Sequence, residues 1–432
     1  MTPPADDADL LPLPPGKGRG EGAGKHRPAP LQGCGPTLAL RLGAQPRPPH
    51  PDPLPEGEGE RAGHHLSLST ARLLVVKIGS ALVTDGAAPR LAWLDGVAAD
   101  IAAARARGTA VIVVSSGAIA LARVALGLTQ PRLRLEEKQA AAAVGQIRLV
   151  QAWSAALQAH GLVAAQLLLT LEDTEDRRRY LNARATLTTL LGLGCVPVIN
   201  ENDSVATAEI RFGDNDRLAA RVAEMVQADQ LVLLSDIDGL YTADPKRDSA
   251  ARHIPVVPQI TPEIEAMGGD PPPGYSSGGM RTKLVAARIV TQAGCAMAIA
   301  VGAVPNPLEV LAGGARCTWF LPAPDGRTAR KRWIAGSLHP TGRLVVDGGA
   351  ARALAAGRSL LPAGVRDVLG EFERGDPVLV QDADGAVLAR GLTAYASTDA
   401  RRIAGRQSDE IEGVLGWRGR DEIVHRDDLV LA

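Results

Sequence analysis

Short apolar runs alternate with stretches of helical periodicity between about residues 72 and 301. Runs rich in β-branched and other apolar residues predict strands at 73–76, 110–114, 163–169, 195–199, 230–235 and 296–301. Helical periodicity predicts helices at 91–107, 136–159, 180–191, 217–226 and 282–292. Because the strands alternate with helices, we expect an α/β fold: a largely parallel open sheet sandwiched by helices.

The pattern changes at both ends of this region. After about Pro322, short strands are separated by Gly-Asp and Asp-Gly turns, which predicts a small, mostly-β domain at 328–432 after an α/β domain at 71–322. Residues 1–70 follow neither period and are rich in Pro and Gly. We therefore predict a disordered, low-complexity extension there. We expect it to arise from translation upstream of the true start, because two of its segments read roughly like arms of an inverted DNA repeat.

Composition narrows the class of protein. The chain of 432 residues has 47 Lys and Arg against 48 Asp and Glu, so its bulk charge recruits neither nucleic acid nor an anionic membrane. The 4 cysteines have no paired spacing, which predicts neither a disulfide framework nor a zinc site and favours a cytoplasmic location. No apolar run is long enough to cross a bilayer, so we expect no membrane association.

Two polar bursts lie close together in the sequence. One, at 200–203, follows an apolar run, and the other, at 213–216, precedes a helical pattern. Ligands of open parallel sheets collect beyond the carboxyl ends of strands, so the bursts predict a pocket for a small, partly cationic ligand. Asp, Asn and Gly are also ordinary turn residues, and either burst alone would fit a solvated turn. Together with the lysines described next, they favour the pocket.

Three further segments combine glycine with hydroxyl or lysine side chains. They are Lys77–Ser80 after the first strand, Ser115–Ala118 after the second, and Ser276–Lys283 at the start of a helix. Backbone N–H groups at such turns and helix starts bind phosphate. Each segment alone also fits a solvated lysine, an N-cap or a linker. The third segment is not a Walker A loop, because the required order of residues is absent.

In this order, the motifs resemble the amino acid kinase family, and in particular its members that phosphorylate glutamate. The resemblance runs from about Arg72 to the carboxyl terminus. Its most specific segments are 198–210, 212–218 and 239–245. The segments 330–334 and 424–428 resemble the PUA domain that these members carry at the C-terminus.

The resemblance implies a role for each matching position. Lys77 and Lys283 would neutralise charge on the transferring phosphoryl group, and Asp216 would orient both lysines. The implied glutamate-binding residues are Ser116, Asp203 and Asn215, with Asn200 and Asp214 close by. The implied ATP-binding residues are Lys77, Ser235, Asp236, Ser277, Gly278, Gly279, Met280, Arg281, Thr282 and Lys283. In one departure from the family, Ser276-Ser277 stands in place of Gly-Thr, and Ser276 lacks the backbone freedom of glycine.

The implied reaction is ATP-dependent phosphorylation of the γ-carboxylate of L-glutamate, the first step of proline biosynthesis. A carboxylate with a pKa of about 4.3 is already nucleophilic at neutral pH, so no general base is needed. Phosphoryl transfer needs alignment and charge stabilisation, which two lysines and Mg²⁺ bound mainly through the ATP phosphates would supply. Asp203 and Asp214 suit the α-ammonium group of free glutamate. The resemblance also implies proline as feedback inhibitor, hand-off to a glutamyl phosphate reductase, and a homo-oligomer.

Three alternatives stay open. Another carboxylate kinase of the same fold could act on acetylglutamate or aspartate, although acidic residues at the ammonium site favour an unblocked amino acid. An RNA-binding protein could act through the PUA domain, but beyond 330–332 the tail has no isolated basic stripe, so we favour a structural or regulatory role. A divalent-metal hydrolase would leave the lysines and the glycine-rich loop unexplained, and the chain has no His-rich ligand set.

Overall fold

A computed structural model describes residues 67–432 apart from 87, 131, 207–213, 270–278 and 325–339. Of the extension expected at 1–70, only the last four residues are described, and three of them form a 3-10 helix, Leu68–Thr70. The expectation of disorder at 1–66 therefore lies outside the described residues. No helix in the described part of the chain combines the length and apolarity needed to span a membrane.

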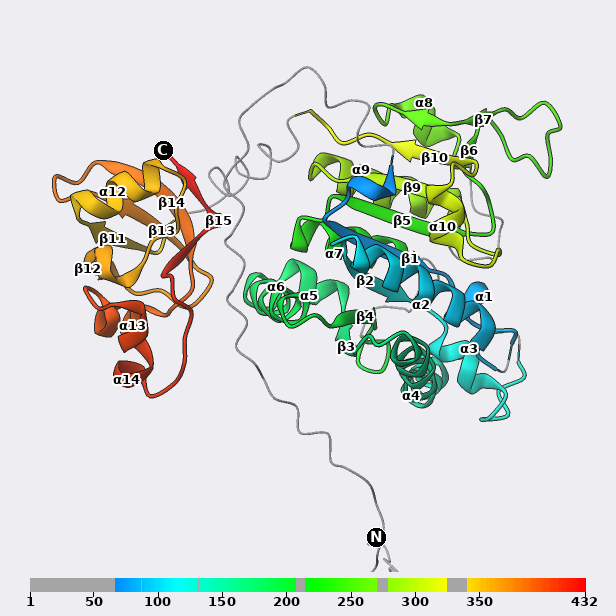
Figure 1. Cartoon of the computed structure of the whole chain (residues 1–432), viewed down its shortest axis with the longest axis horizontal. Coiled ribbons are helices and arrows are strands. Elements are labelled where there is room, and N and C mark those ends of the chain that lie inside the picture. The colour runs from blue at the N-terminus through cyan, green and yellow to red at the C-terminus, as the bar shows by residue number, and fades with distance from the viewer. Residues whose placement is uncertain (1–66, 87, 131, 207–213, 270–278, 325–339) are drawn as a thin grey trace, which may run out of the picture. The chain divides into compact units, whose positions relative to one another are not determined.

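An eight-stranded sheet forms the centre of the α/β region, in the order β3-β4-β2-β1-β5-β9-β10-β8 (Figure 1). Its strands are β1 Leu73–Ile78, β2 Ala110–Ser115, β3 Ala164–Leu169, β4 Val196–Glu201, β5 Gln230–Ser235, β8 Val256–Val257, β9 Ala296–Val301 and β10 Cys317–Phe320. Every pairing is parallel except β9 with β10. The predicted fold class is confirmed. The sequence pattern missed β8 and β10, because strands of two and four residues are too short to show a period.

Helices cover both faces of this sheet. One core cluster joins the sheet to α2 Leu91–Ala106, α3 Ala118–Arg123, α4 Leu135–Ala159 and α10 Pro307–Ala312. The other joins it to α6 Arg177–Gly192, α7 Asp214–Val226 and α9 Met280–Gln292. Short helices α1 Ser80–Val83, α5 Leu171–Glu175 and α8 Pro262–Ala266, and the two-stranded pair β6 Leu240–Tyr241 and β7 His253–Ile254, complete the region.

The alternation of side chains along β1 decides which layer each residue faces. Leu74, Val76 and Ile78 belong to the core under α2 and α4, whereas Val75 belongs to the core under α7 and α9. Successive side chains of a strand point to opposite faces. Lys77 therefore lies on the α7 and α9 face, at the carboxyl end of the strand.

The C-terminal region has its own five-stranded sheet, in the order β12-β11-β13-β14-β15. The strands are β11 Gly342–Val346, β12 Val365–Gly370, β13 Pro377–Gln381, β14 Val387–Thr393 and β15 Val424–Leu431. Its helical elements are α12 Gly348–Ala355, α13 Ser397–Ile403, α14 Ile411–Leu415 and two 3-10 turns, Pro362–Gly364 and Ser408–Glu410. A separate apolar cluster that includes Val378 and Tyr395 fills its core. The expected mostly-β character is confirmed, and the three short helices were not predicted.

Candidate active site

Two lysines from distant parts of the sequence meet at one carboxylate. Lys77 is the penultimate residue of β1, Asp216 lies in the first turn of α7, and Lys283 lies in the first turn of α9. Lys77 Nζ lies 2.5 Å from Asp216 Oδ1, and Lys283 Nζ lies 3.2 Å from Asp216 Oδ2. The three residues are only 8%, 1% and 7% exposed, respectively. Because each oxygen of the carboxylate contacts one ammonium group, Asp216 holds the two cationic tips side by side.

Burial and charge shift the pKa of both Lys77 and Asp216. Burial is the largest influence on Lys77 and, with repulsion from Lys283, it lowers the pKa of the ammonium below its ordinary value despite the attraction of Asp216. Burial also opposes ionisation of Asp216. The two lysines and a hydrogen bond from Thr282 outweigh that effect, so the pKa of Asp216 lies below its ordinary value. Asp216 is therefore a carboxylate at neutral pH.

The start of α9 contributes a second group to this cluster. Thr282 Oγ1 donates to Asp216 Oδ2 at 2.8 Å, and Gly279 is the N-cap residue of the helix. Met280 is half-buried and packs against the core, whereas Arg281 is exposed. The start of a 13-residue helix presents N–H groups and a positive dipole end, both of which suit phosphate. Ser277 and Gly278, also predicted to bind ATP, lie outside the described residues, as does Ser276.

Ser235 and Asp236 stand at the carboxyl end of β5, the strand that pairs with β1. Ser235 Oγ donates to Asp236 Oδ1 at 3.1 Å. The Asp236 side chain is exposed, and it is near enough to raise the pKa of Lys77 slightly against the larger effect of burial. The structure thus brings both residues to the same edge of the sheet as Lys77.

Three of the predicted glutamate-binding residues, Ser116, Asn200 and Asn215, form a hydrogen-bonded cluster beside the lysine pair. Asn215 directly precedes Asp216, and its Nδ2 donates to Ser116 Oγ at 2.7 Å and to Asn200 Oδ1 at 3.2 Å. Asn200 is buried at the end of β4, and Asp203 is buried in the turn that follows. Asp214 is the first residue of α7, and its side chain lies outside the described part of the structure.

Tight backbone packing fixes the loop that carries Ser116. Gly117, the N-cap residue of α3, has a φ of 117°, a left-handed conformation that suits glycine. Behind it, a Cβ added at Gly145 of α4 would overlap the carbonyl oxygen of Ala118. Trp153, fully buried in α4, donates from Nε1 to Ser115 Oγ at 2.9 Å. The side of α4 that meets the sheet therefore sets the position of the loop.

Sequence reasoning missed two polar contacts from α4. Gln146 accepts from Asn200 through Oε1 at 2.8 Å, and Trp153 bonds Ser115. A signal was present, because Gln146 falls on the same helical stripe as the buried residues Ala142, Leu149 and Trp153. A polar residue within an apolar stripe indicates a buried partner.

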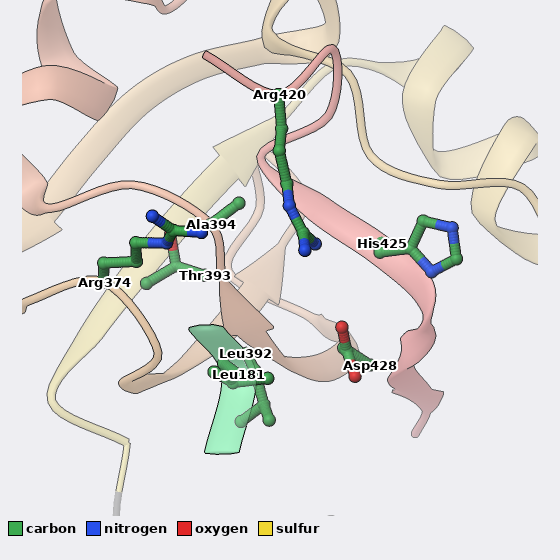
Figure 2. A pocket seen from close by; sticks show the side chains of 8 residues that line it. All are labelled: Leu181, Arg374, Leu392, Thr393, Ala394, Arg420, His425 and Asp428. Carbon is green, nitrogen blue, oxygen red and sulfur yellow. The ribbon is translucent and has the colours of Figure 1, made fainter. Parts of the chain in front are cut away.

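The predicted site residues do not line the pocket shown in Figure 2. That small pocket belongs mostly to the C-terminal region, where the side chains of Arg374, Arg420, His425 and Asp428 surround it. The cluster around Asp216 is therefore defined by its ion pairs and hydrogen bonds and not by this pocket.

Comparison with known proteins places this chain in a family. A model of the amino acid kinase family matches residues 72–300, and a PUA domain model matches residues 342–415. The first match spans more than half of the chain. The chain belongs to the amino acid kinase family.

Within that family, the chain is similar to several glutamate 5-kinases over nearly their whole length. It is 66% identical over 366 residues to the glutamate 5-kinase of Paramagnetospirillum magneticum, covering 84% of this chain and 99% of that protein. The glutamate 5-kinase of Gluconobacter oxydans is 65% identical over 84% of this chain and 97% of its own length. That of Paracoccus denitrificans is 64% identical over 84% of this chain and 98% of its own length. The resemblance drawn from the motifs is confirmed.

Proposed function

We propose that this chain transfers the γ-phosphoryl group of ATP to the γ-carboxylate of L-glutamate. One observation carries the proposal: Lys77 and Lys283 share the carboxylate of Asp216, and the preceding residue, Asn215, donates to Ser116 and Asn200. Adjacent positions of one helix thus join a cationic site for phosphate to a polar site for a small substrate. The glutamate 5-kinase relatives, which this chain matches over most of their length, support the same reaction.

For this reaction the protein has to align the two substrates and stabilise the negative charge on the transferring phosphoryl group. A γ-carboxylate oxygen attacks the γ-phosphorus, the bond from that phosphorus to the β–γ bridging oxygen breaks, and ADP leaves. The substrate carboxylate is already ionised, so no residue removes a proton. The ammonium groups of Lys77 and Lys283 stabilise the negative charge on the transferring group, and Asp216 keeps them together.

The carboxylate at the centre of the cluster does not suit Mg²⁺ as a ligand. Both oxygens of Asp216 are engaged by lysines, and Thr282 also donates to one of them. A magnesium ion would therefore be held mainly by the ATP phosphates, where it would neutralise part of their charge. ATP itself would lie against the start of α9 and the end of β5, with Ser235, Asp236 and the segment 277–283 along it.

The substrate pocket favours a free amino acid over its blocked or shortened analogues. Asp203 and Asn200 are buried, Asn200 accepts a hydrogen bond from Asn215, and the polar burst also contains Asp214. Carboxylates in such a pocket attract an ammonium group, which acetylglutamate lacks. Aspartate keeps the ammonium group, but its side chain is one methylene shorter and would hold its carboxylate away from the lysine pair.

Trapping of the acyl phosphate with hydroxylamine tests this proposal directly. Purified enzyme with ATP, Mg²⁺ and hydroxylamine should form a hydroxamate from L-glutamate but not from acetylglutamate or aspartate. The variant Lys283→Ala serves as the background control. Hydroxamate formed only from acetylglutamate or only from aspartate would assign a different carboxylate kinase. ADP release without any hydroxamate would indicate hydrolysis instead.

We further propose the cellular setting that the same resemblance implies. The enzyme would act in the cytoplasm as a homo-oligomer, pass its reactive product to a glutamyl phosphate reductase, and be inhibited by proline. The C-terminal domain would serve a structural or regulatory role rather than bind RNA. In support, two of its arginines pair with acidic residues of the same domain, Arg366 with Asp347 and Arg401 with Glu371, both at 2.8 Å. Salt-sensitive, tight RNA binding by the full chain would contradict this role.

A further inference from the structure

We propose that Gln146 is a positioning residue that sets the orientation of the side-chain amides in the substrate pocket. The inference rests on the proposed function and adds a specificity device to it. Gln146 lies in α4, half-buried, and its one described side-chain contact goes to Asn200. Acting through that contact, it would decide which atom of Asn215 is offered to the substrate.

Three amides and a hydroxyl form a continuous chain of hydrogen bonds. Asn200 Nδ2 donates to Gln146 Oε1 at 2.8 Å, and Asn215 Nδ2 donates to Asn200 Oδ1 at 3.2 Å. Asn215 Nδ2 also lies 2.7 Å from Ser116 Oγ. Each bond in the chain fixes the turn of the next amide, because an amide presents a donor on one side and an acceptor on the other.

One polar atom in this series of hydrogen bonds has no partner of its own in the described part of the structure. Asn215 Oδ1 is buried and has no hydrogen-bond partner among the described residues. A buried acceptor without a partner costs about 1–3 kcal/mol, so a ligand that donates to it is favoured. At neutral pH, free glutamate has a single donor group, its α-ammonium. The observed orientation therefore matches an amino acid whose amine is unblocked.

The opposite orientation of the two asparagines would conflict with the acceptor of Gln146 and would fit the substrate badly. If Asn200 and Asn215 turned over while Gln146 kept its orientation, Asn200 Oδ1 would face Gln146 Oε1, two acceptors together, and Asn215 Nδ2 would face the position now held by its oxygen. A second donor there would repel an ammonium group. Ser116 does not decide between the two arrangements, since a hydroxyl both donates and accepts. The choice is made at the other end of the chain, at Gln146.

Backbone packing supports Gln146 in this role. It follows Gly145, whose missing side chain lets α4 touch the backbone of Ala118. It also lies on the stripe of α4 that contains buried Leu149 and Trp153. A residue on a rigid, buried helix face holds its hydrogen bond more firmly than a loop residue would.

Two substitutions at one position separate orientation from packing. Gln146→Glu keeps an acceptor and cannot donate, so it locks the observed arrangement. Gln146→Leu removes the acceptor but keeps a similar volume. We expect Gln146→Leu to raise both the KM and the calorimetric Kd for glutamate about five- to tenfold, the effect of one lost orienting hydrogen bond. The KM for ATP and Tm should change little, and Gln146→Glu should stay within about threefold of wild type.

The matched control is Gln151→Leu, the same change at an exposed position of the same helix. It should leave glutamate binding unchanged. Equal losses for Gln146→Leu and Gln146→Glu, or a loss spread evenly over ATP affinity and Tm, would overturn the positioning role. An unchanged KM in Gln146→Leu would overturn it as well. A wild-type enzyme that makes no hydroxamate from glutamate would instead overturn the proposed function, so the two failures are distinguishable.

Discussion

Lys77 Nζ lies 2.5 Å from Asp216 Oδ1, in a site where both residues are buried. Removing the charge of Asp216 leaves two buried ammonium groups without a counter-charge. Because loss of one partner of a buried pair costs about 3–5 kcal/mol, Asp216→Asn should lower the free energy of unfolding by that order. Its kcat should fall at least about 100-fold, since neither lysine keeps its position. Urea unfolding and steady-state kinetics measure the two effects.

A control for this prediction lies on the surface. Asp95 pairs with His160 at 2.9 Å, but its side chain is 58% exposed. Exposed pairs contribute about 0–1 kcal/mol, so Asp95→Asn should leave both stability and kcat nearly unchanged. If Asp216→Asn behaved like Asp95→Asn, the buried ion pair would not organise the site.

The lowered pKa of Lys77 predicts an early alkaline limb in the pH profile. Burial favours the neutral amine, so Lys77 in the free enzyme loses its proton at a lower pH than an ordinary lysine, whose pKa is about 10.4. As pH rises through that pKa, kcat/KM for ATP should fall. Bound phosphates favour the ammonium form, so the limb in kcat should lie at higher pH. Initial rates measured across alkaline buffers would show both limbs.

Substitution by arginine identifies the titrating group. A guanidinium stays charged over the accessible range, so Lys77→Arg should abolish the early alkaline limb even though its rate is lower. Persistence of the same limb in Lys77→Arg would assign the titration to a different group.

Gly145 should be intolerant of even one added methyl group. The Cβ of Gly145→Ala would overlap the carbonyl oxygen of Ala118, so α4 must move away from the loop that carries Ser116. Overpacking of this kind costs about 1–3 kcal/mol. We expect a lower Tm and a higher KM for glutamate, measured by thermal denaturation and initial rates. Gly192→Ala is the matched control, since an added Cβ at that helical glycine meets nothing within 4 Å.

The α/β architecture was predictable because its strands and long helices are periodic enough to be recognised one by one. The helix predicted at 136–159 is α4 at Leu135–Ala159, and the strand at 230–235 is β5. The strand β10, which lies between β9 and β8, was not predictable in this way. It is four residues long and antiparallel to β9, and only its tertiary partners define it.

The sequence indicates which residues at strand ends belong to the candidate site. It does not show which of them contact one another. Period two in β1 places Lys77 opposite Val76, whereas nothing local shows that Lys283 and Lys77 meet at Asp216. That meeting depends on the packing of α7 against α9 and β1. The position of Gln146 on the apolar stripe of α4 indicates a buried partner but does not identify it, and only the structure shows that the partner is Asn200.

The rate of the chemical step in Lys283→Ala tests the central claim most directly. If Lys283 and Lys77 stabilise the transferring phosphoryl group, the variant should lose at least about 100-fold in kcat while its KM for glutamate changes less than about threefold. Tm should stay close to wild type, because the ion pair of Lys77 with Asp216 persists. A kcat near wild type, or a rise in KM as large as the fall in kcat, would contradict the account.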